Sequence, residues 1–172
     1  MIPCYQICKD RGCPHWDEQL MDCPRLPDEC EYVVEHLVSD RENQFLDGKI
    51  HGLWNEREEG KLILQGVSIS GEWEGCLRKW DLNGTLIQET FYKKGCKEGR
   101  HRTWYKDGRM RKEEFFANNY SHGVFSQWHS TGKLFFQGTY EYGKREGVWR
   151  WWGKDGNLIQ QKTFLNDVIY SR

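Results

Sequence analysis

Apolar and polar residues alternate in short runs along most of this chain, with a period of two. In residues 148–152, Val148, Arg150 and Trp152 fall on one side of such a run, and Trp149 and Trp151 fall on the other. Because successive side chains of a β-strand point to opposite faces, the pattern predicts strands with aromatic rings on both faces of a sheet. Frequent glycines leave no uninterrupted amphipathic stretch of about 10 to 12 residues, so helical repeats are not expected.

Pairs of these runs are joined by short turns that contain glycine. Residues 123–129 and 133–140 are rich in aromatic and other strand-forming residues, and they flank the turn Ser130-Thr131-Gly132. Glycine supplies the left-handed backbone conformation that a short hairpin loop requires. The segment is therefore predicted to be a β-hairpin.

The hairpin recurs at a fixed interval. A first series of glycines is spaced by 24 residues four times over and consists of Gly60, Gly84, Gly108, Gly132 and Gly156. A second series is spaced by 23, 24, 24 and 24 residues and consists of Gly52, Gly75, Gly99, Gly123 and Gly147. We interpret the first series as the hairpin turns and the second as the bends at the opposite edge. The chain is thus predicted to be all-β, an elongated single-layer antiparallel β-meander built from five 24-residue hairpin repeats.

Other positions recur in step with the glycines. An apolar residue follows each first-series glycine by two positions and is expected to form one core stripe, made of Leu62, Leu86, Met110, Leu134 and Leu158. Repeat one departs from the pattern, with Arg57 and Ser68 where later repeats carry aromatic residues, as is typical of the end unit of an array. Asn119 replaces the outer glycine of repeat four and is expected to preserve the bend, because asparagine tolerates the left-handed conformation.

The pattern Gly-x-x-x-Gly-x-Trp-x-x-Trp/Tyr-x-x-x-Gly-x-Leu, clearest in residues 143–158 and recognisable in residues 95–110, resembles the MORN repeat. The resemblance covers about residues 47–170 and is closest to the bacterial variant whose members are often labelled antitoxins. It implies a single-layer β-meander that acts as an interaction scaffold, with protein binding and, in some members, acidic-lipid binding. Residues 1–46 lie outside it.

Charge and cysteine content divide the chain into two modules. The net charge is −1, but residues 1–46 hold 4 basic and 10 acidic groups, whereas residues 47–172 hold 21 basic and 16 acidic groups. Five of the seven cysteines also lie in the first segment. We therefore predict a Cys-rich head, residues 1–46, that caps the array, and a repeat array, residues 47–172.

The head carries six soft metal ligands within 27 residues, namely Cys4, Cys8, Cys13, His15, Cys23 and Cys30. Tetrahedral thiolate and imidazole coordination can organise a segment that has almost no apolar core, so a structural Zn²⁺ held by four of these six residues is expected. Reduced free thiols, disulfides and an iron–sulfur cluster are the alternatives.

The sequence contains no recognisable targeting, membrane-spanning or catalytic motif, and the expectations for location and catalysis rest on these absences. No run approaches the roughly 18 consecutive apolar residues of a membrane span, and the first residues do not resemble a secretory signal, so a cytoplasmic location is expected. The histidines of the array, among them His51, His101 and His129, occupy different repeat phases, and no phosphate-binding glycine loop is present. We therefore expect a protein that is not an enzyme.

The strongest lead to a partner is a basic stretch between Lys93 and Lys112, which holds nine basic and two acidic residues. The partner-binding residues predicted in it are Arg100, Arg102, Lys106, Arg109 and Arg111. We expect the partner to be another protein; the alternatives are a phospholipid headgroup or nucleic acid bound through this third repeat, or a solvated surface that only balances the acidic head. An uncovered edge strand near Phe164, Ile169 and Tyr170 also makes a homodimer plausible.

Overall fold

The computed structural model describes residues 45–170, and every regular element within that range is a β-strand. The strands, in chain order, are β1 (Phe45–Leu46), β2 (Lys49–Ile50), β3 (Gly52–Glu58), β4 (Lys61–Ile69), β5 (Glu72–Trp80), β6 (Leu86–Lys93), β7 (Cys96–Trp104), β8 (Met110–Ala117), β9 (Tyr120–Ser121), β10 (Gly123–Trp128), β11 (Leu134–Glu141), β12 (Lys144–Trp152), β13 (Leu158–Leu165) and β14 (Val168–Ile169).

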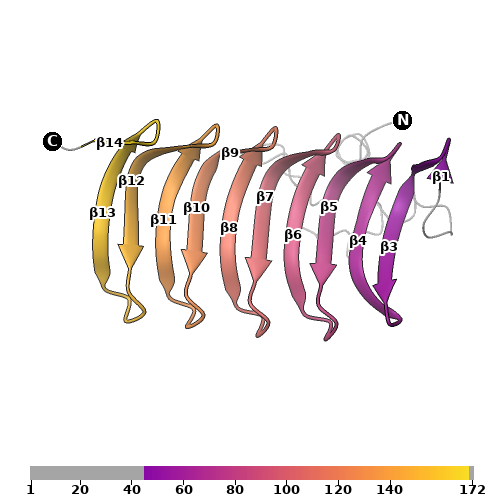
Figure 1. Ribbon diagram of the computed structural model, residues 1–172, viewed down its shortest axis with the longest axis horizontal. Coiled ribbons are helices and arrows are strands. Elements are labelled where there is room, and N and C mark those ends of the chain that lie inside the picture. The colour runs from indigo at the N-terminus through magenta and orange to yellow at the C-terminus, as the bar shows by residue number, and fades with distance from the viewer. Residues whose placement is uncertain (1–44, 171–172) are drawn as a thin grey trace, which may run out of the picture.

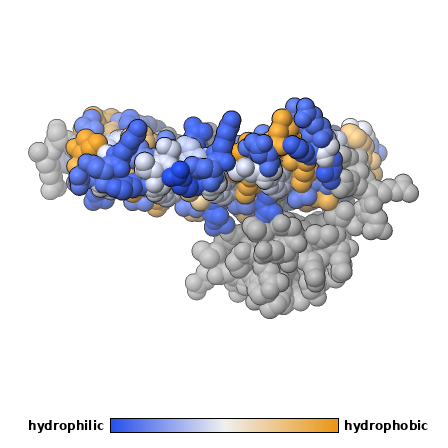
Figure 2. Space-filling model, turned by 90° about the horizontal axis from the view of Figure 1, so that it is seen from below, coloured by the Kyte–Doolittle hydropathy of each residue, from blue (hydrophilic) through white to orange (hydrophobic). Residues whose placement is uncertain are grey.

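Strands β3 to β14 form one antiparallel sheet in which each long strand pairs with its neighbours in sequence (Figure 1). The short strands β9 and β14 follow the bends after β8 and β13 and pair with those strands in the antiparallel direction. Strands β1 and β2 form a separate two-stranded ribbon. Viewed along its lower edge, the described part of the chain is a thin elongated slab (Figure 2). The prediction of an elongated single-layer β-meander is confirmed.

The first glycine series lies in the loops along one edge, as predicted. In the loop between β7 and β8, the Tyr105 amide donates to the Arg109 carbonyl at 2.8 Å and the Gly108 amide donates to the Tyr105 carbonyl at 2.9 Å. Gly108 has a φ of 81°, which glycine adopts without steric cost. Three other loops, residues 81–85, 129–133 and 153–157, repeat both hydrogen bonds.

The interpretation of the second glycine series is wrong. The bends at the other edge are two-residue turns in which both residues are left-handed, as at Lys94 and Gly95 with φ values of 50° and 75°. Gly99 lies instead inside β7, with a φ of 79°, where the register between β6 and β7 shifts. This series therefore marks β-bulges within strands. Asn119 does occupy a bend, with a φ of 69°, which confirms the expectation for that residue.

Each bulge positions an acceptor for the following bend. Glu98 Oε2, directly before Gly99, accepts from the Asn118 amide at 2.8 Å, and the Lys97 carbonyl accepts from the Asn119 amide at 3.0 Å. Glu74 and Glu146 bind the bends of their following repeats in the same way. Consecutive repeats are therefore joined by polar contacts as well as by the strand ladder.

Aromatic rings form the buried core of the described residues. Phe125, Trp149 and Phe164 are buried, and Phe136, Tyr140 and Trp151 pack against them. The expected stripe of aliphatic residues is wrong: those residues begin the returning strands beside the loops, where four of them are half-buried and Leu158 is 54 % exposed. Large flat rings cover their neighbours on a sheet that has no second layer, and the aliphatic side chains at the ends of the strands do not.

Candidate binding face

The two faces of the sheet have different chemistry. We call the face that carries Phe125, Trp149 and Phe164 the aromatic face. Because side chains alternate along a strand, the residues next to these in sequence, such as Val124, Ser126 and Arg150, lie on the opposite face. We call that opposite face the ladder face, after the row of polar side chains described below.

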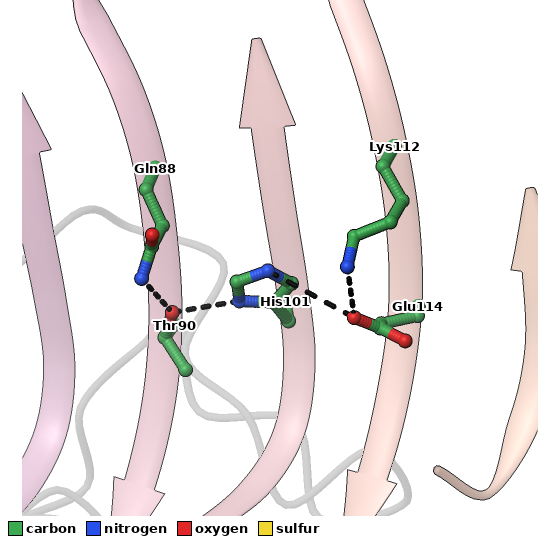
Figure 3. A network of polar contacts seen from close by, with 5 residues as sticks. All are labelled: Gln88, Thr90, His101, Lys112 and Glu114. Atoms are coloured by element: carbon green, nitrogen blue, oxygen red, sulfur yellow. Dashed lines mark hydrogen bonds and ion pairs between the residues drawn. The ribbon is translucent and has the colours of Figure 1, made fainter. Parts of the chain in front are cut away.

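The aromatic face is filled in its middle by a network of polar contacts that crosses β6, β7 and β8 (Figure 3). Gln88 Nε2 donates to Thr90 Oγ1 at 3.1 Å, and the Thr90 hydroxyl lies 2.7 Å from His101 Nδ1. On the other side of the ring, His101 Nε2 lies 3.9 Å from Glu114 Oε1, which also accepts from Lys112 Nζ. The Glu114 carboxylate beside Nε2 favours the ring proton on that nitrogen, and in this tautomer the Thr90 hydroxyl accepts from Gln88 and donates to Nδ1.

The network favours a neutral imidazole. Burial, reinforced by the positive charges of Lys112 and Lys97, lowers the pKa of His101 to about 4. Lys112 also lies over the ring of Phe125, with its Nζ 5.8 Å from the centroid, so the network is continuous with the aromatic cluster. His101 therefore contributes to packing of the sheet, where it contacts the Phe116 ring and the Lys112–Glu114 ion pair.

The ladder face has a row of polar side chains across ten strands, one per strand. In spatial order from β3 to β13 they are Asn55, Gln65, Arg78, Glu89, Arg102, Glu113, Ser126, Gln137, Arg150 and Gln161. Each hairpin contributes one hydrogen-bonded pair, with donor–acceptor distances between 2.9 and 3.2 Å. The pairs run through the centre of the face.

The charges along this row do not balance everywhere. Arg78 Nε donates to Glu89 Oε2 at 3.2 Å, and Arg102 Nε donates to Glu113 Oε1 at 3.1 Å. Arg150 Nε donates instead to the neutral Gln161 Oε1, at 2.9 Å, and the residue opposite on its other side is Gln137. Among the three arginines of the row, Arg78 and Arg102 are paired with carboxylates, whereas Arg150 has only side-chain amides beside it in the row.

Exposed apolar side chains flank the row at its C-terminal end. Phe115, Val124, Val148 and Ile159 are 37 %, 47 %, 38 % and 71 % exposed, and all four lie on the ladder face of β8, β10, β12 and β13. We call this surface, the ladder face of β8 and β10 to β13, the C-terminal ladder face, and it is the candidate site.

Comparison with known proteins agrees with the repeat geometry. A family described as a MORN repeat variant matches residues 73–94, 121–142 and 145–166. Each match spans the two strands of one hairpin and the glycine loop between them, and it ends at the two-residue turn that leads to the next hairpin. Residues 73–166 thus contain MORN-type repeats. The hairpin of β7 and β8, which occupies the phase between the first and second matches, has the same loop and bend.

No curated protein matches the chain at a significant level. Among solved structures, the array is similar to the crystal structure of TarM, at 19 % identity and a TM-score of 0.35 over 56 % of this chain. It is also similar to a mutant of S. aureus TarM in complex with Fondaparinux, alpha-GlcNAc-glycerol and UDP, at 20 % identity and a TM-score of 0.36. In each case the match spans 19 % of the TarM chain.

The structure divides the basic residues predicted to bind a partner between two surfaces. Arg100, Arg102 and Arg111 lie on the ladder face, whereas Lys106 and Arg109 lie in the loop after β7. Arg102 is paired with Glu113, and Arg109 Nη2 lies 2.6 Å from Asp107 Oδ2. Arg100 lies over the ring of Phe91, at 5.9 Å from its centroid, and Lys106 and Arg111 are exposed.

Local charge density does not point to Arg150, because this residue lies outside the basic stretch of residues 93–112. Its position within the repeat does identify it. Arg78, Arg102 and Arg150 occupy equivalent positions in MORN-type repeats, and the residue 11 positions after each is Glu89, Glu113 or Gln161. The exchange of glutamate for glutamine is visible in the sequence only when the repeats are aligned.

The residues predicted to hold zinc, Cys4, Cys8, Cys13, His15, Cys23 and Cys30, lie outside the described residues, as does the proposed head up to residue 44. Within residues 45–170, no three His, Cys, Asp or Glu side chains gather as metal ligands, and no helix is long and apolar enough to cross a membrane. Burial and the neighbouring Glu89 raise the pKa of Cys76 to about 12, so this cysteine is a protonated thiol. The zinc hypothesis stays a prediction, which metal analysis of the full chain purified without chelator would test.

Proposed function

We propose that this MORN-type array is a non-enzymatic protein-binding scaffold and that its partner docks on the C-terminal ladder face. The observation that carries the proposal is the combination of exposed Phe115, Val124, Val148 and Ile159 with Arg150, an exposed arginine on the same surface. Protein interfaces are enriched in aromatic residues and arginine at their centres, and a few such residues dominate the binding energy.

The aromatic face is less suited to this role. Its rings pack against one another, as in the stacked pair Phe125 and Phe136 with centroids 5.2 Å apart, and Trp149 is only 2 % exposed. Its central polar groups are engaged in the His101 network. Anchors that are already buried within the fold offer little additional apolar area to a partner.

The resemblance to MORN variants that are labelled antitoxins favours a partner whose activity is blocked by binding. A flat, extended sheet face can cover the active site of a toxin or effector without any chemistry of its own. We propose this inhibitory role as the specific form of the scaffold function.

The alternative, an anionic ligand bound through the third repeat, is less favoured by the side-chain contacts. Arg102 and Arg109 are both paired with acidic residues of the chain itself. Nucleic acids and anionic membranes are bound by several free cations at once, and such binding weakens steeply with salt. Of the five residues predicted to bind a partner, Lys106 and Arg111 are exposed and lie outside these two ion pairs, in a loop and in a strand respectively.

Affinity capture with matched variants tests the proposal. Val124→Asp and Val148→Asp place a charge on the C-terminal ladder face, and Gln160→Asp places the same charge on the aromatic face of β13. We expect the two valine variants to lose at least tenfold in affinity for the captured protein, since each buries a charge in the interface, and the glutamine variant to retain it. Co-expression with the captured protein should show the same order in growth rescue. Equal binding by all three variants would remove the support for this face.

A further inference from the structure

We infer that the partner contributes a carboxylate, from an aspartate or glutamate set among apolar side chains, that pairs with Arg150. The inference rests on the proposed function and adds the chemistry of the partner at one defined point. It follows from a comparison of equivalent arginines within the same molecule.

Arg102 and Arg150 occupy the same position two repeats apart, in the first strands of equivalent hairpins. Arg102 lies between two carboxylates, 3.1 Å from Glu113 Oε1 and 3.9 Å from Glu89 Oε1. The residues on the two sides of Arg150 are Gln161 and Gln137, the neutral amides of similar shape. Arg150 therefore has the same position in the sheet as Arg102, but neither of the residues beside it in the row carries a negative charge.

The uncompensated charge is presented outward. Arg150 and Gln161 are both exposed, whereas the Arg78 and Glu89 side chains of the second repeat are only 6 % and 3 % exposed. Gln161 takes only the Nε of Arg150. A guanidinium has five N–H donors in a planar fork that fits a carboxylate with two parallel hydrogen bonds, so the remaining donors suit that group.

The surroundings favour a protein carboxylate over a polyanion. Val148 and Trp152 flank Arg150 along β12, and Ile159 lies on the same face of the next strand. An apolar rim around one cation excludes water and strengthens a single ion pair. A nucleic acid would instead require several cations in line with its phosphates, and within the row Arg150 is followed by Gln161 and preceded by Gln137 and Ser126.

The sharpest variant is Gln161→Glu, which places on Arg150 the counter-charge that Arg102 already has. It removes the free charge and leaves the arginine and the fold in place, since the second and third repeats accommodate the same pair. Gln160→Glu is the matched control, because it adds the same charge one residue away on the aromatic face. Arg150→Gln is the second variant, and thermal unfolding of all three checks that each is folded.

The probe is a phage-displayed library of random 15-residue peptides, selected on the full chain. We expect selected peptides to contain an acidic residue between apolar residues. Their affinity should fall about tenfold or more with Gln161→Glu and with Arg150→Gln, as for the loss of an interface hot spot, and remain unchanged with Gln160→Glu. Replacing the peptide's acidic residue with its amide should cost the same factor in the parent chain and little in the Gln161→Glu variant.

Two outcomes separate this inference from the proposed function. Peptides that lose binding with Val148→Asp but bind the Gln161→Glu variant as well as the parent chain would overturn the carboxylate inference and leave the binding face standing. Selected peptides without acidic residues would overturn it as well. Peptides that are insensitive to Val124→Asp, Val148→Asp and Gln161→Glu would contradict both.

Discussion

At the scale of single residues, the fold depends on a few positions where shape or charge leaves no alternative. Gly138 is one of them, because a Cβ at this position would lie 2.1 Å from Trp149 Cδ2. His101 is another, because it fills with a polar network the place that Phe125 and Trp149 fill with rings in later repeats. Both positions lie on the aromatic face, and each makes a specific prediction.

Replacing Gly138 with alanine should displace the Trp149 ring and cost about 1 to 3 kcal/mol of unfolding free energy, as overpacking of a core does. Gly66 occupies the equivalent position three repeats earlier, where the closest atom is the flexible end of Leu77, so Gly66→Ala should cost less. Urea denaturation of the two variants measures the difference. A Gly138→Ala protein as stable as the parent would show that Trp149 does not lie over this glycine.

The lowered pKa of His101 predicts a pH-dependent stability. The pKa falls from 6.5 to about 4 on folding, so between these values the unfolded chain binds more protons and stability is lost as pH falls. The loss amounts to up to about 3 kcal/mol, is complete near pH 4 and is absent above about pH 7. The positive charges of Lys112 and Lys97 help to lower the pKa of His101. The negative charge of Glu114, which faces the ring from β8, favours the protonated ring and opposes this lowering.

Urea midpoints at a series of pH values between 7.5 and 4 check this prediction. His101→Gln lacks the titrating ring, so the difference in stability between parent and variant should change across that range. A difference that stays constant with pH would contradict a neutral, buried His101.

At the scale of elements, the unit of the array is a hairpin joined to the next one by its bulge. In three repeats the residue before the second-series glycine, which is Glu74, Glu98 or Glu146, accepts a hydrogen bond from the next bend. In repeat one His51 Nδ1 accepts from the Ser70 amide at 3.3 Å in the same way. In repeat four the equivalent residue is His122, and its Nδ1 has no hydrogen-bond partner within the described part of the chain. The Glu-Gly pairs of the sequence thus have a mechanical role, connecting nearest neighbours in an array whose stability is a sum of such contacts.

Loss of one such contact should weaken the array locally. Glu98→Ala removes the acceptor for the Asn118 amide and should cost about 1 kcal/mol, the usual net value of one hydrogen bond. Amide hydrogen exchange should accelerate at the bend of residues 117–120 more than at the bend of residues 165–168. Glu141→Ala, at an exposed glutamate of β11, serves as the control. Uniform acceleration along the sheet would indicate a different role for Glu98.

At the scale of the whole molecule, the sequence predicted the architecture well because each repeat contains the same turn chemistry. Glycine at Gly108 and its equivalents fixes the loops, and strict spacing leaves few topologies open. The bulges were misread as bends because a left-handed glycine has the same sequence signal in both settings. The aliphatic stripe was misread because periodicity does not reveal which repeated position is central in the sheet.

The candidate site was only partly predictable for a related reason. Arg100, Arg102 and Arg111 were found from local charge, but pairing within the fold commits Arg102 to Glu113. The free charge at Arg150 depends on what lies beside it on two neighbouring strands, and those neighbours are 11 and 13 residues away in sequence. Only the register of the sheet brings them together.

The central claim, that a protein partner docks on the C-terminal ladder face, is tested most directly by photo-crosslinking. A photoreactive amino acid introduced at Val148 reports on the ladder face of β12, and the same group at Gln160 reports on the aromatic face of the adjacent strand. With the captured partner bound, we predict crosslinks from the group at Val148 and none from the group at Gln160. Crosslinks from Gln160 without any from Val148 would contradict the account.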